Sequence, residues 1–245
     1  MVKISAISYL NTIPFIFGLK NSNLASEIDF HFDYPANCAE SFINKKSDIA
    51  LIPVASLKHL KNYHIISNYC IGANREVDTV CLYSDVDIND VKEIYLDYQS
   101  RTSVELLKIL LREYWKVDPK LVLGIKDYEN NINKSSAGLV IGDRAFKLNG
   151  KFKYTYDLSE IWYRMTNLPF VFACWVSREK MSGLFLNNFN KALAYGLNNI
   201  KLAIDEQARA YSKGNDPLSY LNDKISYDFN TDKQKALSLF LSKII

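Results

Sequence analysis

Short runs of alternating or wholly apolar residues, separated by amphipathic stretches, set the organisation of this chain. Alternation predicts strands over residues 2–6 and 28–34, and a short apolar run that ends in proline predicts a buried strand over residues 48–53. An apolar run over residues 15–19 and helical spacing over residues 36–44 predict helices. Strands that alternate with helices are typical of βαβ units, so we predict an α/β fold.

A second unit of the same kind follows. Residues 94–97 are predicted as a strand, residues 99–103 as a polar loop and residues 104–114 as a helix with one apolar face. Residues 137–143 form an apolar run that ends in Gly-Asp, which is typical of a strand that leads into a turn on the ligand side of a sheet. The apolar, β-prone run 168–176 is predicted to return the chain to the first unit.

This pattern predicts two lobes. We expect a discontinuous first lobe made of residues 1–84 and 173–245, and a second lobe made of residues 85–172. Amphipathic stretches fill the last third of the chain, so this part is predicted to close the first lobe with helices.

Composition and charge narrow the class of protein. The chain has 245 residues, 48% hydrophobic and 23% charged, with a formal net charge of +3, which is too balanced to indicate a nucleic-acid partner. No apolar stretch approaches the ~18 residues of a membrane span, and the start lacks the apolar segment of a signal peptide. The four cysteines contain no C-x-x-C pair, so we expect a cytoplasmic protein with buried, reduced thiols. The sequence leaves the oligomeric state open.

Common catalytic motifs are missing from the sequence. It contains no G-x-G-x-x-G, no G-x-x-x-x-G-K-[ST], no H-E-x-x-H and no G-x-S-x-G. The three histidines lie apart, and none has a second ligand at metal-binding spacing. We therefore expect neither a metal site nor a nucleotide cofactor.

Polar loops before predicted helices are the best candidates for a binding site. Ser100, Arg101, Thr102 and Ser103 offer hydroxyls, a guanidinium group and free backbone N–H groups, which together suit a carboxylate or a phosphate. The same residues also fit a simple helix cap with Arg101 in a structural ion pair. The residues alone leave both interpretations open.

Three further groups of side chains are weaker candidates. Asn11 lies in a similar loop, where it either donates to a ligand or caps the helix. Asp97 and Asp143 each end a predicted strand, where an aspartate acts as a base or pins the loop. Four aromatic residues near the return strand either wall a pocket for a planar ring or pack in the core: Trp162, Phe170, Phe172 and Trp175.

Five motifs, taken in order along nearly the whole chain, point to a known family. They are Ser8-Tyr9-Leu10-Asn11, Asp48-Ile49-Ala50-Leu51-Ile52-Pro53, Asp97-x-x-Ser100-Arg101-Thr102-Ser103, Ile141-Gly142-Asp143 and Trp162-x-x-x-Thr166-x-Leu168-Pro169-Phe170-x-Phe172-Ala173-x-Trp175. In order and spacing, this set resembles the chorismate dehydratase family of the futalosine route to menaquinone. Thr79 stands where a serine is expected in that family, and Gln99 stands where Ser or Thr is usual.

The resemblance implies a fold and a reaction. The fold is a two-lobed, type II periplasmic-binding-protein-like α/β fold with its ligand in the cleft between the lobes. The reaction is the loss of water from chorismate to give 3-[(1-carboxyvinyl)oxy]benzoate, without a cofactor. The competing interpretation is a non-catalytic binding protein for small anions with the same fold, since fold alone does not decide function. Such a capture protein is expected to carry an export signal or a lipid-anchor cysteine near its start, and we find neither there.

With chorismate as substrate, the polar loops acquire predicted roles. The expected substrate-binding residues are Ser8, Tyr9, Ser100, Arg101, Thr102, Ser103 and Phe170, and the expected catalytic residues are Asn11, Thr79 and Asp143. Ser100, Thr102 and Ser103 are expected to hold one carboxylate, while Arg101 either binds substrate or only braces its loop. The proton acceptor is either the enolpyruvyl carboxylate of the substrate or Asp143.

Overall fold

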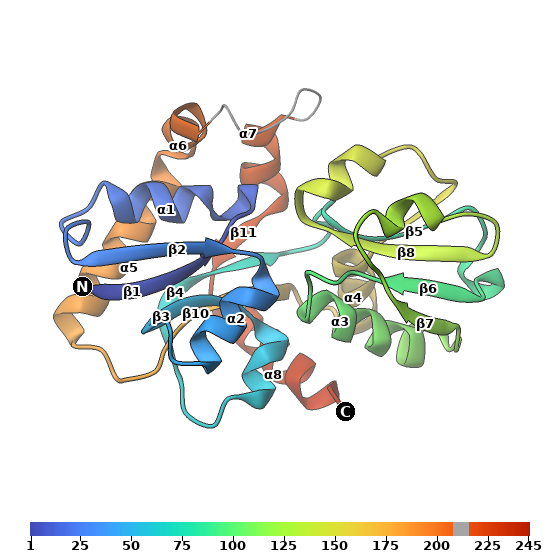
Figure 1. The fold of residues 1–245 in the computed structure, drawn as a ribbon, viewed down its shortest axis with the longest axis horizontal. Coiled ribbons are helices and arrows are strands. Elements are labelled where there is room, and N and C mark those ends of the chain that lie inside the picture. Colours follow the sequence, from blue (N-terminus) through green and yellow to red (C-terminus); the bar gives the residue numbers. More distant parts are fainter. Residues whose placement is uncertain (208–215) are drawn as a thin grey trace.

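The computed structural model describes residues 1–207 and 216–245 and shows two α/β lobes, each built around its own sheet (Figure 1). The first sheet has the strand order β11–β4–β10–β3–β1–β2, with β1 (Val2–Ile7), β2 (Ile28–Asp33), β3 (Ile49–Pro53), β4 (His64–Ala73), β10 (Phe170–Ser177) and β11 (Ser226–Asp228). The second sheet has the order β7–β6–β8–β5–β9, with β5 (Val80–Ser84), β6 (Glu93–Leu96), β7 (Lys120–Leu123), β8 (Ser136–Ile141) and β9 (Tyr154–Asp157).

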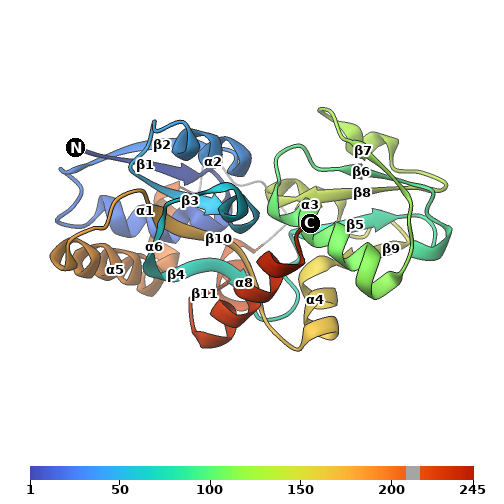
Figure 2. The same ribbon diagram turned by 90° about the horizontal axis from the view of Figure 1, so that it is seen from below.

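Helices cover both sheets (Figures 1 and 2). The α-helices are α1 (Ile13–Lys20), α2 (Pro35–Ile43), α3 (Thr102–Leu110), α4 (Leu158–Thr166), α5 (Gly183–Asn198), α6 (Ile200–Gln207), α7 (Pro217–Ser219) and α8 (Thr231–Lys243). Short 3-10 helices are η1 (Leu10–Thr12), η2 (Val54–His59), η3 (Ile88–Asp90), η5 (Tyr128–Asn131) and η6 (Gly142–Leu148), and two π-helical turns are η4 (Leu111–Trp115) and η8 (Tyr220–Lys224). Within the described residues, no helix has the length and apolar character needed to cross a membrane.

The first lobe follows the predicted βαβ pattern. Strands β1, β2 and β3 are parallel, and every residue of β3 is buried, which explains its continuous apolar sequence. Strand β10 runs antiparallel between β3 and β4, so the prediction that residues 168–176 return to the first unit is confirmed. The four cysteines are buried as predicted.

Two predicted lobe boundaries differ from the sheets that the structure contains. Residues 80–84 were expected in the first lobe, yet they form β5, which pairs with β8 and β9 of the second sheet. Strand β10 already begins at Phe170, before the expected boundary at residue 173. Periodicity shows that such a segment is a strand, but it does not show which sheet the strand joins. Residues 208–215, which the prediction included in the first lobe, lie outside the described residues.

Two segments connect the lobes, residues 74–79 between β4 and β5 and residues 167–169 between α4 and β10. Asp157 ties the first of them to the N-terminus of α4. One of its carboxylate oxygens accepts from the backbone N–H groups of Val77 and Asp78 at 2.8 and 2.7 Å, and the other accepts from Ser159 and Glu160 at 2.9 and 3.1 Å. Burial raises the pKa of Asp157 to about 6. Because one buried carboxylate satisfies four backbone donors, it fixes the crossing segment that carries Thr79.

Candidate active site between the lobes

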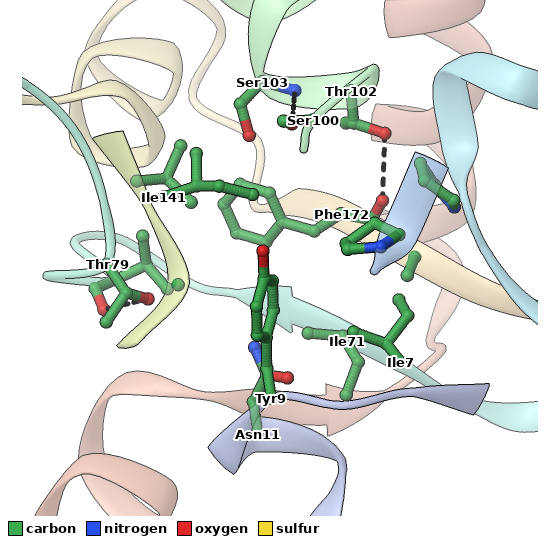
Figure 3. Close-up of a pocket in the computed structure, with 16 residues that line it drawn as sticks. Ile7, Tyr9, Asn11, Ile71, Thr79, Ser100, Thr102, Ser103, Ile141 and Phe172 are labelled. Atoms are coloured by element: carbon green, nitrogen blue, oxygen red, sulfur yellow. Dashed lines mark hydrogen bonds between the residues drawn. The ribbon is translucent and has the colours of Figure 1, made fainter. Parts of the chain in front are cut away.

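A cavity lies where the two lobes meet (Figure 3). It encloses about 510 Å³ of empty space, counting the part that is open to solvent. Both lobes line it, with Ile7, Tyr9, Asn11, Pro35, Pro53, Ile71, Val77, Thr79, Val80, Ser100, Thr102, Ser103, Ile141, Gly142, Phe172 and Ala173. Most of these residues are apolar, and the few polar groups come from loops at the ends of strands. This composition is typical of a site for a small organic molecule.

The N-terminus of α3 supplies hydrogen-bond donors on the second-lobe side of the cavity. The Ser100 hydroxyl accepts from the Ser103 backbone N–H at 3.0 Å, so Ser100 caps the first turn of the helix. Ser103 is 2% exposed, and among the described residues its hydroxyl has no hydrogen-bond partner. Figure 3 shows this hydroxyl directed toward the centre of the cavity. A free hydroxyl at a helix N-terminus suits an anionic group of a ligand.

Thr102 uses its hydroxyl to join the lobes. It donates to the Phe172 carbonyl at 3.1 Å and accepts from the Ala55 backbone N–H at 3.2 Å. Both partners belong to the first lobe, so the first turn of α3 is held against the first sheet. Thr102 lines the cavity, but its proton is engaged by Phe172 in this geometry. Its predicted role as a carboxylate ligand stays a prediction.

Arg101 does not line this cavity. Its guanidinium group pairs with Glu40 of α2 at 2.8 Å, across the boundary between the lobes. Both side chains are partly exposed, so the pair contributes little to stability. Of the two roles left open by the sequence, the geometry matches the bracing of the loop.

Tyr9 reaches from the first lobe to the second. Its hydroxyl donates to Gln99 Oε1 at 2.6 Å. Its ring lies so close to Gly142 that a Cβ atom there would be 2.9 Å from the ring, and Gly142 has a φ of +64°. Figure 3 shows the ring standing between Asn11 below it and Phe172 above it. Tyr9 therefore lines the cavity and also joins the lobes, because Gln99 in the second lobe accepts its hydrogen bond.

Asn11 lines the cavity at the end opposite to α3, and Thr79 lines its flank. Asn11 belongs to η1, and its backbone carbonyl accepts from the Tyr227 hydroxyl at 3.0 Å. Thr79 is 1% exposed, and its Oγ1 atom lies 2.8 Å from the Tyr220 hydroxyl. The sequence analysis missed both tyrosines, because no spacing distinguishes a tyrosine beside a site from a tyrosine in the core.

Asp143 lies beside the cavity. Among the described residues it is not part of the lining, although its neighbour Gly142 is. Its carboxylate accepts from the Leu10 backbone N–H at 3.4 Å, which is a contact between the lobes. Burial raises the pKa of Asp143 to about 6. A carboxyl group with this pKa can exchange a proton near neutral pH.

Two predicted binding residues lie elsewhere. Ser8 is exposed, and its hydroxyl donates to the Asp33 carbonyl at 3.4 Å. Phe170 is 1% exposed and packs edge-to-face against Trp162, Phe172 and Phe240, so it belongs to the core. Of the four aromatic candidates near the return strand, Phe172 is the one that lines the cavity. The pairing of β10 with β4 shifts register between Val171 and Ala173, which breaks the alternation that would otherwise give both phenylalanines the same environment.

Asp97 pins the loop that precedes α3. This buried carboxylate accepts from the backbone N–H groups of Gln99 and Ile141 at 2.9 and 3.0 Å and from the Tyr128 hydroxyl at 3.0 Å. It also forms an ion pair with Arg144, a residue that the sequence analysis did not single out. Of the two roles considered for Asp97, the structure shows the structural one.

Two lobes with a mainly apolar cavity between them, closed by loops at strand ends, define a periplasmic-binding-protein-like fold. Solved structures confirm this class. A protein from Archaeoglobus fulgidus matches with a TM-score of 0.75 and 17% identity over 99% of this chain and 96% of that one. The periplasmic aliphatic sulphonate binding protein from Escherichia coli matches with a TM-score of 0.60 and 12% identity over 100% of this chain and 91% of that one. At these identities the likeness shows the fold alone.

Sequence comparison identifies the family. Residues 2–244 match the model of a family described as menaquinone biosynthesis, so the chain belongs to that family. A chorismate dehydratase from Thermus thermophilus is 29% identical over 147 residues. This match covers 51% of each chain, so the chain spans about half the length of the curated relative it matches. The resemblance found in the five motifs is thereby confirmed at the level of the family.

The contact between Tyr9 and Gly142 gives a first prediction. Gly142→Ala places a methyl group 2.9 Å from the Tyr9 ring at a φ of +64°, whereas Gly150→Ala at a φ of +72° meets no atom within 4 Å. Both variants carry a backbone cost of about 1 kcal/mol, and only Gly142→Ala also separates the lobes. In urea unfolding we expect Gly142→Ala to lose about 1–3 kcal/mol more than Gly150→Ala, because the lobe contact cannot re-form around the methyl group. Equal losses would contradict the assigned contact.

Proposed function

We propose that this protein is a chorismate dehydratase, which removes water from chorismate to give 3-[(1-carboxyvinyl)oxy]benzoate. Family membership and the activity of the Thermus thermophilus relative, a chorismate dehydratase, support the proposal. The observation that carries it is the placement of donors around one apolar cavity, with Ser103 and the α3 N-terminus at one end, Asn11 at the other and Thr79 at the flank. The futalosine route and a cytoplasmic location belong to the same proposal.

The lining of the cavity suits one carboxylate and the ring of chorismate. This substrate is a dianion with a ring carboxylate and an enolpyruvyl carboxylate. In our proposal the Ser103 hydroxyl and the N–H groups of the first turn of α3 hold one carboxylate, because the positive end of the helix dipole favours a negative charge there. The ring then lies among Ile71, Ile141 and Phe172, which are apolar residues of the lining.

The reaction needs orientation and hydrogen-bond donors more than a strong nucleophile. A base takes a ring proton, the C–H electron pair becomes a π bond of the new aromatic ring, and the C–O electron pair leaves with the hydroxyl group. The abstracted proton joins that hydroxide, so water is released and no electrons are left over. We place Asn11 and Thr79 at the departing hydroxyl, where preorganised donors lower the barrier.

The position of Asp143 supports the substrate as its own base. Asp143 is not part of the cavity lining among the described residues, and its carboxylate is used by Leu10. The enolpyruvyl carboxylate of chorismate enters the cavity attached to the ring. It therefore lies close to the ring proton and can act as the base that removes it. Contacts between the lobes through Tyr9 and Thr102 limit the access of water to this step.

The proposed activity predicts a direct result with purified protein. Incubation with chorismate should yield the aromatic product, followed by chromatography. Asn11→Ala and Thr79→Ala should each lower kcat by about 10²-fold, because each removes a donor to the leaving group. Asn89→Ala, which removes an exposed amide in η3 of the second lobe, serves as control and should retain wild-type kcat. Tight binding of chorismate without any product would instead indicate the non-catalytic anion-binding protein.

The identity of the base gives a separate prediction. A base at Asp143 must be ionised, so its pKa of about 6 would make kcat rise as the pH increases through 6, and Asp143→Asn would abolish this rise. With the substrate carboxylate as base, we expect Asp143→Asn to keep kcat within about tenfold of wild type, since only a lobe contact is weakened. A pH profile of kcat for both proteins decides between them. Loss of about 10³-fold in Asp143→Asn would show that Asp143 is the base.

A further inference from the structure

The Tyr220 hydroxyl is a buried polar group that the proposed mechanism does not yet use. Tyr220 begins η8 in the C-terminal segment and is 6% exposed. Its ring packs edge-to-face against Phe146 of the second lobe, with ring centroids 5.0 Å apart. Its hydroxyl oxygen lies 2.8 Å from Thr79 Oγ1 on the crossing segment. Tyr220 thus brings the C-terminal segment, the second lobe and a cavity-lining threonine together.

The direction of the hydrogen bond between Tyr220 and Thr79 follows from the partners that each group has. Two side chains among the described residues act on the Tyr220 hydroxyl. Thr79 Oγ1 lies 2.8 Å from it, and the Asn11 amide acts on it as a donor, since Asn11 Oδ1 already accepts from Thr12. If Thr79 donated to Tyr220, the phenolic proton would be buried without an acceptor, which is costly. If Tyr220 donates, its proton is satisfied. The Thr79 hydroxyl can then donate, among the described residues, only to the Val77 carbonyl. The distance from Thr79 Oγ1 to that oxygen is 3.4 Å, which is long for a hydrogen bond.

Burial also keeps Tyr220 in the form that donates. Removal from water raises the pKa of Tyr220 above its ordinary value, and the nearby Asp143 carboxylate raises it further, while Thr79 and Asn11 act in the opposite direction. The phenol is therefore protonated throughout the neutral pH range. The groups that shift the pKa of Tyr220 include all three residues that the sequence analysis named as catalytic: Asn11, Thr79 and Asp143.

We propose that Tyr220 is a positioning residue that donates to Thr79 Oγ1 and thereby leaves the Thr79 proton free to bond the hydroxyl that departs from the substrate. The inference rests on the proposed dehydratase function. When Tyr220 donates to Thr79 Oγ1, the hydrogen bond from Thr79 to the substrate becomes stronger. Negative charge that develops on the leaving oxygen is then shared by both hydroxyl groups. Tyr220 itself does not touch the substrate.

The test compares kcat and KM in a double-mutant cycle. Tyr220→Phe removes the hydroxyl and keeps the ring that packs on Phe146, and Thr79→Val removes the threonine hydroxyl at the same shape. We expect Tyr220→Phe to lower kcat about 10- to 100-fold with KM within about twofold, because the lost interaction is strongest in the transition state. The double variant should be no slower than Thr79→Val alone, since Tyr220 acts only through Thr79. Tyr156→Phe, which loses a hydroxyl that accepts from Ile88, should keep wild-type kcat.

The outcomes separate this inference from the proposed function. A wild-type protein that does not convert chorismate overturns both. If the wild type is active and Tyr220→Phe leaves kcat unchanged, the inference alone is overturned. It is also overturned if the fold-losses in kcat of the two single variants multiply in the double variant, because Tyr220 would then act through the fold and not through Thr79. Should Tyr220→Phe fail to fold, 3-fluorotyrosine at position 220 keeps the hydroxyl and makes it a stronger donor. The inference then expects kcat to rise with KM constant, and an unchanged or lowered kcat contradicts it.

Discussion

The hydrogen bonds of the Thr102 hydroxyl hold the two lobes in the relation on which the site depends. By donating to Phe172 and accepting from Ala55, this one side chain fixes the first turn of α3 against the first sheet. The free donors of that turn then line the same cavity as Asn11 and Thr79. Tyr9 closes another part of the boundary through Gln99. A site formed by two lobes needs such contacts, because neither lobe alone carries both sets of donors.

The hydroxyl groups in the loop 100–103 have separate tasks, although they are adjacent in the sequence. Ser100 caps the helix, Thr102 joins the lobes, and Ser103 directs its hydroxyl into the cavity. Arg101 turns away to Glu40. A single polar motif therefore supplies a cap, a lobe contact, a ligand donor and a loop brace. A substitution in this loop changes activity for different physical reasons at each position.

Local pattern was enough to predict much of this molecule. The α/β class, the return of residues 168–176 to the first sheet and the loop at the start of α3 all follow from periodicity and capping residues. Long-range pairing was not predictable in the same way, so residues 80–84 were assigned to the wrong sheet. Phe172 lines the cavity where Phe170 was expected, and a register shift in β10 separates the environments of the two residues. Tyr220 escaped notice because its partner Thr79 is 141 residues away in the chain.

The central claim is that the cavity between the lobes binds chorismate with one carboxylate at the N-terminus of α3 and with the departing hydroxyl at Asn11 and Thr79. A crystal structure of the protein with 3-[(1-carboxyvinyl)oxy]benzoate bound tests it most directly. We predict one carboxylate within hydrogen-bond distance of the Ser103 hydroxyl and the α3 N-terminus, with the aromatic ring between Phe172 and the Asn11–Thr79 side. A ligand bound outside this cavity, or one with neither carboxylate at α3, would contradict the account.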